Sequence, residues 1–152
     1  MNFSILLPSS KSVVIRQMTA RFVLTGALLP LRGGECDDVR VAHRALEVVS
    51  ASAGRGAVVD VADCGAAGRF MMALLAVTPG DWLLTGTPRL LARPMDGLLN
   101  ALCSIGGRIS AGERGWHIEG RALRAETLSV DVRHSSQFAS ALLLIAPKLG
   151  LR

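Results

Sequence analysis

The segment Ser135–Pro147, SSQFASALLLIAP, places two hydroxyl groups and an amide directly before an apolar helix. The first turn of a helix carries backbone N–H groups without partners and a partial positive charge, so polar side chains there favour the binding of phosphate or carboxylate. We predict a helix that begins at Ser135 and is ended by Pro147 and Gly150. Its start is predicted to bind an anion.

Two other segments have the same organisation. A short strand over residues 3–7 is followed by Ser9-Ser10-Lys11-Ser12, which leads into a helix predicted over 12–28. Gly65-Ala66-Ala67-Gly68-Arg69 begins a further helix, here with glycines in place of hydroxyls. Three such helix starts within 152 residues indicate a protein that binds a small molecule with several negative charges.

The rest of the chain alternates between strand and helix patterns, which predicts a mixed α/β (α+β) fold in one domain. Asp37-Asp38 is suited to cap a helix, and Pro94 is suited to be the first residue of one. The element order that starts at Lys11 recurs from Gly65 and begins again at Ser135, which indicates a structural repeat. The other predicted helices are 39–50, 65–77 and 94–105, and the other predicted strands are 57–62, 82–85, 108–110, 116–119 and 127–131.

Composition argues against several classes of protein. Half of the residues are apolar and 19% are charged, which predicts a packed core rather than disorder. Aromatic residues make up 4%, too few for a surface that stacks single-stranded nucleic acid. The net charge of +5 is carried by arginine apart from Lys11 and Lys148, and the basic residues are scattered. A nucleic-acid-binding tail is therefore not predicted.

Cysteines and histidines lack the spacing of a metal site. No C-x-x-C pair occurs, so we predict reduced thiols of a cytoplasmic protein, with Cys64 and Cys103 buried. No metal or organic cofactor is predicted. The apolar stretches are too short for a bilayer and no signal-peptide pattern is visible, so no membrane association is predicted. The three cysteines and three histidines are Cys36, Cys64, Cys103, His43, His117 and His134.

Four blocks resemble the motifs of one enzyme family. LPSSKSVVIR (Leu7–Arg16) resembles P-G-S-K-S-x-x-x-R, and LTGTPRLLARPMDGLLNAL (Leu84–Leu102) resembles L-T-G-x-x-R-x-x-x-R-P followed by a helix. SSQFASALLLIAP resembles S-S-Q-[FY]-x-[ST]-A-L-L-x-x-A-P, and DCGAAGR (Asp63–Arg69) resembles N-A-G-T-A-x-R loosely. The blocks follow in family order over nearly the whole chain, which resembles the N-terminal third of the 5-enolpyruvylshikimate-3-phosphate synthase family.

The resemblance implies transfer of an enolpyruvyl group from phosphoenolpyruvate to the 5-hydroxyl of shikimate 3-phosphate, in the shikimate pathway. It implies no cofactor, a cytoplasmic location and a monomer in the full-length form. The implied fold is an inside-out α/β barrel of repeated β-α-β-α-β-β units. Residues 1–152 would form a partial lobe, with two units over 12–131 and the first helix of a third at 135–148. The second lobe, with the family's acid–base aspartate, would be absent, so the isolated chain is expected to be inactive.

Residues at the first and last helix starts take roles from the resemblance. Lys11 matches the family lysine that contacts both substrates near the reacting atoms, and it is the predicted catalytic residue. Gln137 also matches a residue that reaches both substrates. The shikimate 3-phosphate site is further predicted to contain Ser12, Arg16, Ser135 and Ser136. Each has a structural alternative, such as a helix cap for the serines or a solvated helix charge for Arg16.

The phosphoenolpyruvate site is predicted around the glycine-rich start. Gly65 matches a glycine whose backbone approaches this substrate closely, and Arg93 matches an arginine that grips it. Arg89 is expected to support Arg93 from behind. The alternatives are a plain strand-to-helix turn for Gly65 and an exposed loop charge for Arg93.

The sequence departs from the family pattern around this site. Asp63 stands where many members have Asn, which would bring a negative charge near an anion site. An alternative alignment places a three-residue deletion between Gly68 and Arg69. The other departures are Ser9, Ala66, Gly68, Phe70 and Asp96-Gly97.

Three other functions remain open. One is a non-catalytic anion-binding remnant. Another is the enolpyruvyl transferase that acts on UDP-N-acetylglucosamine, although that family pairs its lysine with Asn, and it carries a reactive Cys before an Arg-Pro pair. Here Lys11 is followed by Ser12, and no Cys lies between Trp82 and Pro94. General nucleic-acid binding rests only on the sequence pI of about 10.1.

Overall fold

An apolar helix, α3 (Gly65–Ala76), lies at the centre of the fold. In the computed structural model, which describes residues 10–150, ten of its twelve residues are buried. Its sequence, GAAGRFMMALLA, is apolar on nearly every side. A helix of this kind is stable only when other elements surround it. The core of the molecule is therefore organised around α3.

Four strands form one open sheet in the order β1-β2-β4-β3. β1 and β2 are parallel, and α3 forms the crossover that connects them. β4 pairs antiparallel with β2 on one side and with β3 on the other. The strand bounds are β1 Val58–Asp60, β2 Gly80–Thr85, β3 Arg108–Gly112 and β4 Gly115–Gly120.

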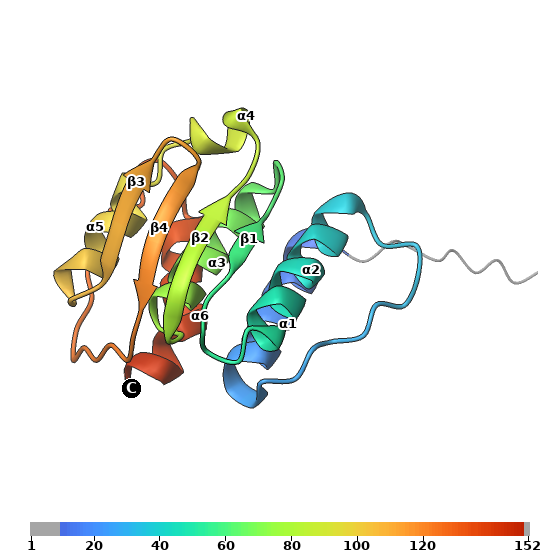
Figure 1. The fold of residues 1–152 in the computed structure, drawn as a ribbon, viewed down its shortest axis with the longest axis horizontal. Helices are drawn as coiled ribbons and strands as arrows, with labels where there is room; N and C mark the ends of the chain where they lie inside the picture. The colour runs from blue at the N-terminus through green and yellow to red at the C-terminus, as the bar shows by residue number, and fades with distance from the viewer. Residues whose placement is uncertain (1–9, 151–152) are drawn as a thin grey trace, which may run out of the picture.

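Helices cover one face of this sheet (Figure 1). α3 and α5 pack against the strands, and α6 packs on α3. α2 lies beside β1 at the edge of the sheet, and α1 packs against α2, α3 and α6. Side chains alternate accordingly: Trp82 and Leu84 of β2 and Ile118 of β4 are buried, whereas His117 and Glu119 on the opposite face of β4 are exposed. The other helix bounds are α1 Lys11–Thr25, α2 Asp37–Ala51, α4 Pro88–Leu91, α5 Asp96–Ser104 and α6 Gln137–Leu149.

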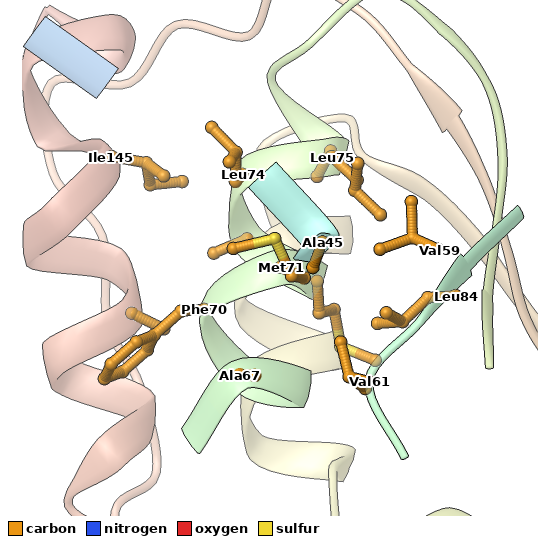
Figure 2. Close-up of a cluster of buried hydrophobic side chains, with 14 of the residues drawn as sticks. Ala45, Val59, Val61, Ala67, Phe70, Met71, Leu74, Leu75, Leu84 and Ile145 are labelled. Carbon is orange, nitrogen blue, oxygen red and sulfur yellow. The ribbon is translucent and has the colours of Figure 1, made fainter. Parts of the chain in front are cut away.

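The three helices with polar or glycine-rich starts, α1, α3 and α6, pack against one another. Figure 2 shows Phe70 of α3 directed towards α6, which contributes Ile145 to the same cluster. On the other side of α3, Val59, Val61 and Leu84 come from the strand layer. Sequence positions that are far apart are thus brought together by apolar contacts behind the helix starts.

The mixed α/β fold predicted from the sequence is confirmed, and most elements lie close to their predicted ranges. The predicted strand over residues 3–7, and Ser9, lie outside the described residues. Asp37 and Asp38 form the first turn of α2 rather than its cap, a position taken by Cys36. Carboxylates in a first turn favour a helix electrostatically even without a capping hydrogen bond.

The predicted strand over 127–131 is wrong, since no strand is formed there. Leu128 and Val130 are half-buried and pack against the core, so the apolar alternation did identify side chains that turn inward. A strand also needs a partner for its backbone groups. Among the described residues, this segment pairs with no strand.

Three helix boundaries also differ from prediction. An extra short helix, α4, begins at Pro88, where the Thr87 hydroxyl accepts a hydrogen bond from the Leu90 N–H at 3.2 Å. α5 therefore begins at Asp96 rather than at Pro94. α6 begins at Gln137 rather than Ser135, and Pro147 lies inside it. The chain leaves α6 at Gly150, whose φ of 76° is readily adopted by glycine.

The two cysteines predicted to be buried differ in their exposure to solvent. Cys64 is buried, and burial raises the pKa of its thiol, so the thiol stays protonated. Cys103 is exposed, so its predicted burial is wrong. The inner face of α5 is instead formed by Leu98, Ala101 and Leu102.

Candidate functional site

A pocket of about 310 Å³ lies where the starts of α1, α3 and α6 meet. The helix starts supply Lys11, Ser12, Gly65, Ala66 and Gln137, which come from three separate parts of the sequence. The complete lining consists of Lys11, Ser12, Ile15, Asp38, Asp63, Gly65, Ala66, Arg93 and Gln137. We call this cavity the helix-start pocket.

Five of the eight residues assigned to substrates from the sequence line the helix-start pocket, namely Lys11, Ser12, Gly65, Arg93 and Gln137. The other three, Arg16, Ser135 and Ser136, are not among its lining residues. The structure thus brings together Lys11 and Gln137, which are expected to contact both substrates, and Gly65 and Arg93, which are expected to contact phosphoenolpyruvate alone.

The start of α3 leaves one backbone donor free at the pocket. The Cys64 sulfur accepts a hydrogen bond from the Ala67 N–H at 3.5 Å. Within residues 10–150, the preceding N–H group of Gly65 has no hydrogen-bond partner. Such groups, together with the helix dipole, favour an anion.

Gly65 itself lies against two arginines. A Cβ added at this position would collide with the Arg93 guanidinium and would lie 2.7 Å from Nη1 of Arg69. A side chain at position 65 would therefore displace the ends of two cationic side chains. The sequence had suggested close approach of a substrate as the reason for this glycine.

Lys11 lies at the open side of the pocket. Its ammonium group donates a hydrogen bond of 2.7 Å to Asp38 Oδ2 on α2, and 62% of the side chain is exposed. This hydrogen bond and the charge of Asp38 raise the pKa of Lys11. The ammonium group is therefore charged at neutral pH, and it can exchange Asp38 for an anionic ligand because water reaches it.

Arg93 also lines the pocket and lies beside Asp63. One guanidinium nitrogen, Nη2, is 3.3 Å from Asp63 Oδ1, and Nη1 of Arg89 is 3.4 Å from Asp63 Oδ2. The Thr87 hydroxyl also donates to Asp63 Oδ1 at 3.3 Å. The negative charge that the sequence placed near the phosphoenolpyruvate site thus contacts the arginine assigned to that substrate.

The sequence analysis did not assign a role to Arg69, which lies directly behind the pocket. Its Nη1 atom donates to the Gly65 carbonyl oxygen at 3.0 Å and to Gln137 Oε1 at 3.1 Å. A signal was available, because an arginine in the otherwise apolar sequence of α3 is unusual. Asp38 was also missed, and since it lies 27 residues from Lys11, no local pattern pointed to their pairing.

The three predicted residues outside the lining lie near the start of α6 or between helices. Arg16 donates to the Ser12 carbonyl oxygen at 3.0 Å and to the Ser140 hydroxyl at 3.2 Å. Ser135 accepts a hydrogen bond from the Gln137 N–H at 3.2 Å, and Ser136 occupies the cap position of α6 without a side-chain capping bond. The exposed Ser136 hydroxyl is therefore available to a ligand.

Among residues 10–150, no cluster of three or more His, Cys, Asp or Glu side chains is arranged to hold a metal ion. Within the same range, every helix is too short or too polar to cross a bilayer. The polar groups of the helix-start pocket are therefore two cations, two carboxylates, one hydroxyl, one amide and the backbone at the start of α3.

Comparison with known proteins identifies the family. The sequence model of EPSP synthase (3-phosphoshikimate 1-carboxyvinyltransferase) matches residues 34–150. The chain belongs to the EPSP synthase family. A 3-phosphoshikimate 1-carboxyvinyltransferase of Bacteroides fragilis is 36% identical over 150 residues, which cover 96% of this chain and 35% of that protein. Another, from Bordetella avium, is 34% identical over 162 residues, covering 93% and 37% of the two chains.

A solved structure agrees with the assignment to the EPSP synthase family. EPSP synthase from Acinetobacter baumannii superimposes with a TM-score of 0.68 over 93% of this chain and 37% of that chain. At 20% sequence identity, this likeness concerns the fold. The chain spans about a third of the length of the curated relatives that it matches.

Proposed function

We propose that the helix-start pocket binds the anionic groups of phosphoenolpyruvate and shikimate 3-phosphate, and that this chain supplies part of a site for enolpyruvyl transfer. The convergence of Lys11, Arg93 and Gln137 on one pocket is the observation that carries this proposal. Membership of the EPSP synthase family supplies the identity of the two substrates.

The pocket offers two sets of groups. Arg93 and the free N–H group of Gly65 suit the phosphate or carboxylate of phosphoenolpyruvate. Lys11 and Ser12 suit shikimate 3-phosphate. Gln137 lines the same pocket, and we propose that it contacts both substrates.

Arg16, Ser135 and Ser136 would extend the shikimate 3-phosphate site beyond the pocket. Arg16 lies one helical turn after Ser12, and its bond to Ser140 directs it towards α6. Ser136 is exposed at the start of the same helix. A ligand larger than the pocket could therefore contact the α1 and α6 surfaces together.

In the proposed reaction, the 5-hydroxyl oxygen forms a bond to C2 of phosphoenolpyruvate and loses its proton, while the bond between C2 and the phosphate oxygen breaks. Inorganic phosphate leaves with that oxygen. Lys11 is proposed to be catalytic because a cation close to both substrates would stabilise the negative charge on the departing phosphate. The proton steps would need further groups, and we propose that these lie in the family's second lobe.

The proposed architecture is the inside-out α/β barrel of the enolpyruvyl transferases. α1, α3 and α6 are the first helices of the three predicted units, and their mutual packing supports a repeat with its helices on the inside. In this view residues 12–131 form two units and residues 135–148 begin a third. A cytoplasmic monomer in the full-length form stays a prediction.

Anion binding without catalysis is the second candidate. It is favoured by the pairing of Lys11 with Asp38 and of Arg93 with Asp63, since both lining cations already have carboxylate partners. The transferase acting on UDP-N-acetylglucosamine is disfavoured by the family match.

Calorimetric titration of the 152-residue protein with shikimate 3-phosphate tests the proposal. We expect weak, saturable binding, which Arg16→Ala weakens about tenfold through loss of a charged hydrogen-bond donor. Arg133→Ala is the matched control, because Arg133 is an exposed arginine held by Asp131 outside the pocket. Absence of binding, or equal effects of the two substitutions, would contradict the proposal. Phosphate release from both substrates would separately contradict the expected inactivity of the isolated chain.

A further inference from the structure

Arg69 is a buried cation without a carboxylate partner. Only 9% of its surface is exposed, and within residues 10–150 it forms no ion pair with Asp or Glu. Burial, and then the charge of nearby Arg93, lower the pKa of the Arg69 guanidinium. Burying a charge is costly unless other interactions offset it. We therefore expect Arg69 to have a role beyond packing in the core.

The neighbours of Arg69 are two pocket residues and an aromatic ring. Nη1 uses its two hydrogens to bond the Gly65 carbonyl oxygen and Gln137 Oε1. The guanidinium carbon lies 5.5 Å from the centre of the Phe138 ring, next in sequence to Gln137. Nε is buried without a partner. Arg69 thus connects the start of α3 to the start of α6.

The bond to Gln137 determines which end of its amide faces the pocket. A guanidinium has only donors, so the amide must present its oxygen to Arg69. The reverse orientation would place an NH₂ group against another donor inside the protein, and both would lack an acceptor. The NH₂ group of Gln137 is therefore the end left for the helix-start pocket, which Gln137 lines.

We propose that Arg69 is a positioning residue that holds the Gln137 amide with its NH₂ group towards the helix-start pocket. The ligand atom that meets Gln137 is then a hydrogen-bond acceptor, such as an oxygen of a phosphate or carboxylate, and a ligand hydroxyl there must accept rather than donate. This inference rests on the proposed function. It adds Arg69 as the residue that orients Gln137, the side chain proposed to contact both substrates. Arg69 itself is not expected to contact the ligand.

The first test needs no ligand. In the free protein, NMR relaxation of the Gln137 side-chain NH₂ group should show an amide as rigid as the backbone. Arg69→Lys keeps the charge but loses the planar fork, so we expect the Gln137 amide to become mobile. Arg16→Lys is the matched control, because Arg16 also lies over an aromatic ring, at 5.4 Å from Phe70, and also bonds to α6. An equally mobile Gln137 amide in wild type and Arg69→Lys would overturn the proposal.

The second test is a double-mutant cycle with shikimate 3-phosphate as the probe. Arg69→Lys should weaken binding about fivefold in the wild-type background, and by less than about 1.5-fold in a Gln137→Ala background, because its effect passes through Gln137. Equal effects in both backgrounds would overturn the proposal. If the wild type binds no ligand, the proposed function fails, while the NMR test still decides the role of Arg69.

Gln137→Glu provides a variant that should fold well. One carboxylate oxygen can still accept from Arg69, which gives the buried cation a partner, so the unfolding midpoint should be at least that of the wild type. The other oxygen would face the pocket as an acceptor. Binding should therefore be weaker than in Gln137→Ala. Binding equal to or tighter than that of Gln137→Ala would overturn the assigned amide orientation.

Discussion

The helix-start pocket and a larger hollow beside α5 differ in how their cations are neutralised. The second hollow, of about 620 Å³, is lined by residues that include Asp96, Asp131, Arg133 and His134, and we call it the α5 hollow. Its one arginine, Arg133, donates three hydrogen bonds of 2.6–3.1 Å to Asp131. Asp96 adds a second carboxylate to the lining. The α5 hollow is thus acidic. It is twice as large as the helix-start pocket.

The helix-start pocket has the opposite balance of charge, with more cations than carboxylates around it. Lys11 and Arg93 line it with Asp38 and Asp63, while Arg69 and Arg89 contact its residues from behind. Four cations therefore surround two carboxylates. The pocket also has the free backbone N–H group of Gly65 at the start of α3. Charge balance and helix starts, rather than volume, distinguish the candidate anion site.

The largest effect is expected from removing a cation of the helix-start pocket. Arg93→Ala should weaken the binding of phosphoenolpyruvate and of inorganic phosphate about 10- to 100-fold, because a hydrogen bond from a charged donor is lost. Isothermal titration calorimetry measures this change. Arg133→Ala in the α5 hollow should leave both affinities unchanged, and a comparable loss there would remove the distinction between the two regions.

A smaller effect is expected from adding one methyl group at the pocket. Gly65→Ala would displace the ends of the Arg93 and Arg69 side chains, so phosphate binding should weaken about tenfold. Gly68→Ala, one turn along the same helix, would make only ordinary contacts of 3.5 Å or more with Leu90 and Val61. If Gly68→Ala weakened binding as much as Gly65→Ala, crowding of the arginines would not be the cause.

Removing the negative charge of Asp63 should strengthen binding. Asp63→Asn frees Arg93 from a partly exposed ion pair, and such pairs contribute little, so we expect phosphate affinity to rise about threefold. Asp131→Asn also removes a carboxylate bonded to arginine, but in the α5 hollow, and should leave phosphate affinity unchanged. Weaker phosphate binding by Asp63→Asn would instead indicate that Asp63 orients Arg93 for the ligand.

The smallest effect concerns acid stability in the α5 hollow. Hydrogen bonds from Arg133 lower the pKa of Asp131 from 3.8 to about 2. A carboxyl group with a lowered pKa stabilises the folded state above its unfolded pKa, and this contribution is lost as the pH falls from about 4 to 2. The free energy of unfolding of the wild type, measured by chemical denaturation, should therefore fall across this range. That of Asp131→Asn should fall less. An identical decline in both proteins would contradict this role of Asp131.

Much of the fold was predictable from local patterns. The apolar sequence of α3 and the polar starts of α1 and α6 predicted three helices and indicated the ends at which they meet the helix-start pocket. The segment 127–131 was mispredicted because strand formation depends on a partner strand, which alternation within one segment does not reveal. The extra helix α4 depends on the Thr87 cap, which is a local signal in the sequence.

The candidate site was predictable only in part. Motif resemblance named five lining residues, but it did not reveal Asp38 or the buried position of Arg69. Pairing between Lys11 and Asp38 joins two helices and depends on their packing. The orientation of Gln137 likewise depends on a contact across 68 residues of sequence. Such relations arise from tertiary structure and leave no periodic signal in the chain.

The central claim is that three helix starts form one anion site, and an NMR titration of the isotope-labelled chain with shikimate 3-phosphate tests it most directly. We expect saturable shifts of the backbone amides at Ser12, Gly65 and Gln137 with a single dissociation constant. The amides of Asp131 and Arg133 should stay unchanged. Shifts confined to the α5 hollow, or different dissociation constants at the three helix starts, would contradict the account.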